Sequence, residues 1–148
     1  MKSLDKNIES GVASDQWQKL FVLTEHWQSD LEFYKDDLLF LHHLVDKYFI
    51  WITKSENLEI VKEIMQQIND LQNRCRKLIE KVQEHRHNFA AFVKNPESVR
   101  WQNILEHHEE MEMKIFEFVK EFRANRKEVF RITGYVLDSE ELTALIKS

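Results

Sequence analysis

The fold is decided by residues 61–92, which read VKEIMQQINDLQNRCRKLIEKVQEHRHNFAAF. Apolar residues, with one cysteine and one histidine among them, recur here at alternating steps of three and four: Val61, Ile64, Ile68, Leu71, Cys75, Leu78, Val82, His85, Phe89 and Phe92. Only a helix brings this spacing onto one face, and its persistence is typical of helices that pack at about +20° to one another. The stretch therefore predicts a long helix with one buried seam.

The same alternation is found on both sides of this stretch. Towards the N-terminus it runs through Leu20, Thr24, Trp27, Leu31, Tyr34, Leu38, Leu41, Val45, Tyr48 and Ile52. Towards the C-terminus it runs through Trp101, Ile104, His108, Met111, Ile115, Phe118, Phe122, Asn125 and Val129. Continuing the first series beyond Ile52 would place glutamates in the core, so a turn must separate it from the second series. The sequence thus predicts three helical segments, at about residues 15–54, 55–94 and 96–132.

Turn and capping residues mark the ends of these segments. Ser55 or Asn57 can cap the second segment, because either side chain accepts a hydrogen bond from a free helix amide. Asn95 is the expected cap of the third, with Pro96 at its first helical position, where no amide hydrogen is needed. Gly134 predicts a left-handed residue at which the third segment ends.

Short connections make successive helices antiparallel. We therefore predict an all-α fold, an up-down-up antiparallel bundle of three long helices plus a short C-terminal helix, which dimerisation would complete. The expected parts are a polar N-terminal segment (1–14), a helical bundle domain (15–132), and a C-terminal turn and short helix (133–148).

The composition supports this fold class. The chain has 148 residues, of which 43% are hydrophobic, and its 2 glycines and 1 proline are too few to punctuate a sheet of short strands. A formal net charge of −5 argues against nucleic acid as a partner. The single cysteine allows no internal disulfide and indicates a reducing compartment. The most apolar stretch, residues 38–52, contains charges and is shorter than the roughly 20 residues that a bilayer needs, so we expect a cytoplasmic protein with no membrane partner.

The first helical segment carries more apolar surface than one seam can use. Its additional large residues include Phe33, Phe40, Leu44 and Trp51, which lie beside the seam rather than in it. Large exposed apolar patches usually mark interfaces, so we expect these four residues to form the contact of a homodimer. The alternative is that the two ends of the chain fold over this surface.

Ionisable residues stand at or beside several seam positions. If the chain turns near residues 55 and 95, Asp30, His85, His108 and Glu112 fall at similar levels of the bundle. Buried charges need partners, so this set predicts either a hydrogen-bonded structural layer or a zinc or iron site. We expect the structural layer, because the two Glu-x-x-His pairs of a ferritin-like site are not present.

Two further expectations follow from the same folding of the chain. Arg74 lies opposite Asp37, which makes them a candidate ion pair. Cys75 occupies a seam position, so its thiol should be buried and without activation.

No motif for catalysis is found in the sequence. Two glycines cannot build a glycine-rich phosphate loop or the turn that presents a serine nucleophile. We therefore predict a non-enzymatic helical bundle without a cofactor, which acts through self-association and contact with a protein partner. The alternative function is a metal-binding bundle, and a third interpretation places a small apolar ligand among the aromatic residues Trp27, Tyr34, Phe89 and Trp101.

Overall fold

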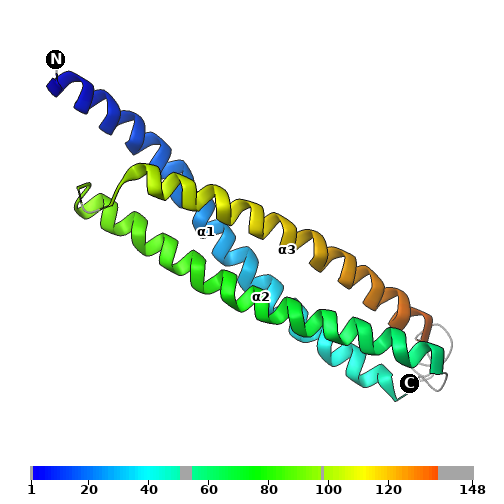
Figure 1. Cartoon of the computed structure of the whole chain (residues 1–148). Helices are drawn as coiled ribbons and strands as arrows, with labels where there is room; N and C mark the ends of the chain where they lie inside the picture. The colour runs from blue at the N-terminus through cyan, green and yellow to red at the C-terminus, as the bar shows by residue number, and fades with distance from the viewer. Residues whose placement is uncertain (1, 51–54, 98, 137–148) are drawn as a thin grey trace. The chain divides into compact units, whose positions relative to one another are not determined.

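The computed structural model describes the backbone of residues 2–50, 55–97 and 99–136, and the side chains within 15–50, 57–97 and 99–134. Over these ranges the chain forms three helices, α1 (Lys2–Phe49), α2 (Ser55–Lys94) and α3 (Trp101–Val136), and no strand (Figure 1). The predicted all-α class is therefore confirmed. The predicted short helix at residues 138–147 lies outside the described residues.

The helices contribute to two compact units. The first unit contains Met1–Glu32 and Lys77–Ile115, and the second contains Phe33–Arg76 and Phe116–Ser148. In both units α2 is antiparallel to α3, and α1 runs parallel to α3. The contacts that fix these directions in the first unit are Trp17 with Phe89, Gln28 with Arg86, Gln16 with Trp101, Trp27 with His108 and His85 with His108. Those in the second unit are Tyr34 with Phe118, Asp37 with Arg126, Arg74 with Glu121 and Gln67 with Asn125.

The core follows the predicted seams closely. In α2 every seam residue from Val61 to Phe89 is buried, and only Phe92 is half-buried. In α3 the seam is buried from Ile104 to Val129. α1 differs in that its seam residues Leu20, Trp27 and Tyr34 are half-buried. Burial of apolar area at about 25 cal/mol per Å² is the main force that stabilises such a bundle, so the seams explain why the three helices pack.

The predicted starts of the first and third helices differ from the structure. α1 begins at Lys2, so the backbone of residues 2–14, within the predicted polar N-terminal segment, is helical. α3 begins at Trp101 rather than Pro96. The Asn95 side chain accepts a hydrogen bond from the Glu97 amide at 3.2 Å, which makes a turn there and not the first turn of a helix. The carbonyl of Arg100 instead accepts the bonds of the first turn of α3.

The predicted left-handed cap at Gly134 is also wrong. α3 continues through this residue to Val136, and none of the described glycines has a positive φ. A Cβ atom added to Gly134 would meet nothing within 4 Å, so neither packing nor backbone conformation requires glycine at this position.

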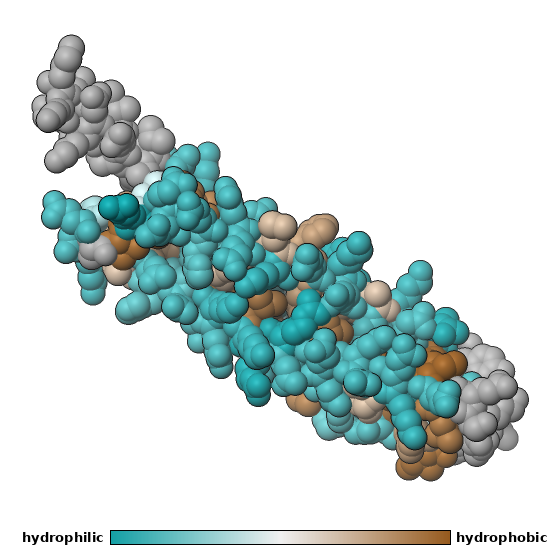
Figure 2. Space-filling view, viewed as in Figure 1, coloured by the Kyte–Doolittle hydropathy of each residue, from teal (hydrophilic) through white to brown (hydrophobic). Residues whose placement is uncertain are grey.

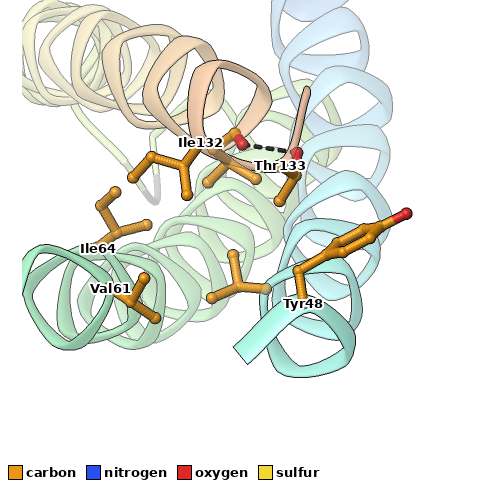
Figure 3. Close-up of a pocket in the computed structure, with 7 residues that line it drawn as sticks. Tyr48, Val61, Ile64, Ile132 and Thr133 are labelled. Carbon is orange, nitrogen blue, oxygen red and sulfur yellow. Dashed lines mark hydrogen bonds between the residues drawn. The ribbon is translucent and has the colours of Figure 1, made fainter. Parts of the chain in front are cut away.

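A small cavity lies between the three helices in the second unit (Figure 3). Its volume is about 10 Å³, and its lining is apolar apart from Thr133, whose hydroxyl donates to the Val129 carbonyl at 2.7 Å. The figure shows the Tyr48 hydroxyl pointing away from this space. A water molecule needs about 10–15 Å³ and two or more polar partners. The cavity is therefore a gap in packing and not a ligand site.

Candidate functional site

A buried pair of histidines lies in the first unit. His85 of α2 is 0% exposed and His108 of α3 is 4% exposed, and His85 Nε2 lies 3.1 Å from His108 Nδ1. One ring must donate and the other must accept, so at least the accepting imidazole is neutral when this hydrogen bond forms. Aromatic rings cover the pair: Trp27 stacks on His108 with ring centres 4.3 Å apart, and Phe89 meets His85 edge-on at 4.7 Å.

Burial shifts the titration of both histidines. The pKa of His85 is lowered to about 4, mainly because burial disfavours the imidazolium and further because His108 and His107 lie nearby. The pKa of His108 is also lowered by burial, which Glu112 partly opposes. The outer nitrogens of the pair, His85 Nδ1 and His108 Nε2, have no hydrogen-bond partner among the described residues. The pair is therefore a neutral element of the core.

The predicted four-residue layer was wrong in two of its members. Asp30 and Glu112 are both exposed, whereas His85 and His108 are buried. Asp30 does not reach the histidine pair because the indole of Trp27, and not a carboxylate, covers the His108 ring. Asp30 lies one turn further along α1 and points to solvent.

The histidine pair does not provide a metal site. A zinc ion in a protein takes three or four protein ligands. Within residues 15–50, 57–97 and 99–134 no group of three or more His, Cys, Asp or Glu side chains could hold a metal ion. The two nitrogens that face one another already share the hydrogen bond. The predicted alternative of a metal-binding bundle therefore lacks a ligand set in this part of the chain.

A second candidate site is a surface of the second unit, where four phenylalanine side chains are exposed on the side where α1 lies next to α3. Phe33 is 64% exposed, Phe40 52%, Phe116 71% and Phe130 40%. We call these four residues the phenylalanine face. Leu44, which was predicted with Phe33 and Phe40, is half-buried beside them, and Trp51 lies outside the described residues.

Contacts between α1 and α3 place the four phenylalanines on one surface. Tyr34 packs against Phe118 and Phe122, with ring centres 6.0 and 4.8 Å apart. Phe33 therefore lies at the level of the turn after Phe116. One turn further along α1, Asp37 accepts a hydrogen bond from the Arg126 guanidinium at 3.0 Å.

The Arg126 guanidinium also lies over the ring of Phe130, 4.6 Å from its centre. Phe40 follows Asp37 by three residues on the same side of α1, so it lies near the level of Phe130. The Asp37–Arg126 ion pair thus joins α1 to α3 beneath the phenylalanine face.

The two helices bring different charges to this face. On α3 the exposed residues Phe116, Lys120, Arg123, Lys127 and Phe130 follow one another at steps of four and three and form a basic stripe. On α1 the residues between Phe33 and Phe40 include Asp36, which is exposed, and Asp37, which is half-buried. The face is therefore apolar at four points, acidic along α1 and basic along α3.

Within the second unit, the acidic residues of α3 lie away from the phenylalanine face. Glu121 pairs with Arg74 of α2, which also lies 3.9 Å from Asp70. The predicted pair of Arg74 with Asp37 is therefore wrong, because Asp37 pairs with Arg126. Figure 2 shows one side of the molecule, where hydrophilic side chains predominate and hydrophobic ones form small clusters.

Two other predictions can be compared with the structure. The Cys75 thiol is buried, as expected, and burial raises its pKa to about 11, so it is not activated as a nucleophile. Among the described helices none has a segment sufficiently long and apolar to cross a membrane.

The α3 half of the phenylalanine face was not predicted from the sequence. Phe116 and Phe130 do not belong to the α3 seam, and the signal that could have found them is their place in a second series with Lys120, Arg123 and Lys127.

Comparison of the chain with protein-family models, with curated proteins and with solved structures finds no match.

Proposed function

We propose that this chain is a self-associating helical bundle that acts through protein contact, and that a second copy docks on the phenylalanine face. The observation that carries the proposal is the exposure of four phenylalanine side chains on one side of the second unit. Apolar clusters of this kind usually mark interaction sites, and aromatic residues are enriched at the centres of interfaces.

The charges of the face favour a second copy as its occupant. A two-fold interface uses the same surface on both subunits, so that surface must be complementary to itself. A face with only basic residues would repel its copy. Here the acidic residues of α1 lie beside the basic stripe of α3, so the same surface offers both partners of an ion pair.

Sedimentation velocity at micromolar concentration tests the proposal. The variant is Phe40→Ser, and the matched control is Leu39→Ser, because Phe40 and Leu39 are adjacent on α1 and both are 52% exposed. Leu39 lies outside the phenylalanine face. Burying a phenylalanine contributes about 1.5–3 kcal/mol, and a two-fold interface counts each substitution twice.

We expect a wild-type dimer, a dissociation constant raised about a hundredfold or more in Phe40→Ser, and little change in Leu39→Ser. A wild-type protein that sediments as a monomer at about 100 µM, where even a weak dimer would be populated, would overturn the proposal. Equal weakening by the two substitutions would also overturn it, because the contact would then not be at this face.

A further inference from the structure

The proposed self-association leaves open how the two copies are oriented, and the charges of the phenylalanine face distinguish the alternatives. A second copy can lie on this face with its helices antiparallel or parallel to those of the first, and both arrangements have two-fold symmetry. They differ in which helices meet. The antiparallel dimer lays α1 on α1 and α3 on α3, and the parallel dimer lays α1 of each copy on α3 of the other.

The centre of the face is occupied by charge on both helices. Asp36 lies midway between Phe33 and Phe40 on α1, and Arg123 lies midway between Phe116 and Phe130 on α3. Both side chains are exposed. The contact between Asp37 and Arg126 places these two midpoints at nearly the same level of the unit.

An antiparallel dimer centred on the face therefore sets like charges against one another. Asp36 would face Asp36 of the second copy, and Arg123 would face the second copy's Arg123. Like charges that meet in an interface are strongly unfavourable, and they are a common means of excluding a wrong arrangement.

A parallel dimer sets opposite charges against one another. Asp36 of each copy would lie over Arg123 of the other, at the same level and in two equivalent places. The phenylalanines of α1 would lie on either side of that arginine, where their rings can contact the guanidinium as Phe130 contacts Arg126 within the chain.

We infer that two copies pair in parallel through this face, with α1 of one copy along α3 of the other and Arg123 held by the second copy's Asp36. The inference rests on the proposed function and specifies its partner and orientation. The basic stripe of α3 is then the recognition surface for the acidic side of α1.

Charge reversal tests the orientation. The variants are Asp36→Lys, Arg123→Glu and the double variant with both changes, and the dissociation constant of each dimer is measured by sedimentation. The control is Glu117→Lys, which makes the same charge change at an exposed position of α3 outside the face. Circular dichroism checks that every variant keeps the helical content of the wild type.

In the parallel dimer each single reversal creates two like-charge contacts, and the double variant restores two opposite-charge contacts. We expect each single reversal to raise the dissociation constant about tenfold or more, the double variant to return within about threefold of the wild type, and Glu117→Lys to change it little.

An antiparallel dimer gives a different result, because each position on the face then meets its own copy. The lysine that Asp36→Lys introduces would face a second lysine, just as Asp36 faces Asp36 in the wild type, so the single reversals would leave the affinity unchanged. A dimer that Phe40→Ser dissociates but that neither single reversal weakens would overturn the parallel orientation while the proposed function stands. A wild-type monomer would overturn both.

Discussion

Lowering the pH should destabilise this protein through the histidine pair. His85 and His108 share a hydrogen bond that needs at least one neutral ring, and aromatic residues enclose both. The pKa of His85 in the folded chain is about 4, whereas its ordinary value is 6.5. Because the folded state holds the neutral form, the unfolded chain takes up a proton first as the pH falls. The stability from neutral His85 is therefore complete well above pH 6.5 and is lost as the pH falls towards 4.

The size of the loss follows from the two pKa values. Between pH 7 and pH 5 the unfolded chain protonates His85 almost fully and the folded chain protonates it little, which lowers the free energy of unfolding by about 2 kcal/mol. His108 changes stability in the same direction, because burial lowers its pKa as well. The groups near the pair on α3 are His107, whose charge opposes protonation of His85, and Glu112, which favours protonation of His108.

Urea unfolding at pH 7 and at pH 5 measures this loss. The comparison protein is the double variant His85→Leu/His108→Leu, in which both partners of the hydrogen bond are replaced by apolar side chains and no polar group is left without its partner. All other titrating groups are the same in the two proteins. We expect the wild type to lose at least about 2 kcal/mol more than the double variant over this pH range, because the variant lacks both histidines and the lowered pKa of His108 adds to the loss from His85. Equal losses in both would refute the account of the pair as neutral in the folded state.

Two further predictions concern the second unit. Gly134→Ala should raise the free energy of unfolding by about 0.5–1 kcal/mol, because the residue is helical and a Cβ atom meets nothing within 4 Å; thermal unfolding checks this, and a decrease would indicate the left-handed cap instead. A double-mutant cycle on Asp37→Ala and Arg126→Ala should give a coupling of about 0.5–1 kcal/mol, and the cycle with Arg74→Ala in place of Arg126→Ala should give none. Coupling of Asp37 to Arg74 would contradict the structure, in which the Asp37 side of α1 faces α3 and not α2.

The fold was predictable because burial in a bundle depends on spacing alone. A seam with steps of three and four fixes which side of each helix faces the others, and polar residues in the seam do not alter this. Asn125 is buried as the seam requires, and its amide nitrogen reaches the Gln67 side chain at 3.1 Å. The helix ends were harder to predict, because they depend on which of several neighbouring polar groups accepts the free amides, as Asn95 and Arg100 show.

The candidate site was only half predictable. The exposure of Phe33 and Phe40 follows from their position outside the α1 seam. Asp30 was misplaced because the turn positions give its level in the bundle, but they do not say which side chain of α1 reaches across to His108. Trp27 is the longer side chain and lies in the seam, so it makes that contact.

The seams of a three-helix bundle do not determine its handedness. The seams and the turns bring Arg74, Asp37 and Arg126 to similar levels, but they do not determine whether the Asp37 side of α1 faces α2 or α3. The pairs Asp37–Arg126 and Arg74–Glu121 show that it faces α3. In the opposite hand this side of α1 would face α2, and Phe33 and Phe40 would be separated from the basic stripe.

The same choice determines whether the chain has a surface that can recognise its own copy. With α3 on the Asp37 side of α1, the acidic residues of one helix and the basic residues of the other lie on one face, between four exposed phenylalanines. Self-complementarity is thus a property of the handedness and not of any one helix, because the face takes its acidic residues from α1 and its basic residues from α3. Reversing one charge should therefore disturb the pairing of two copies while leaving the seam that folds each copy intact.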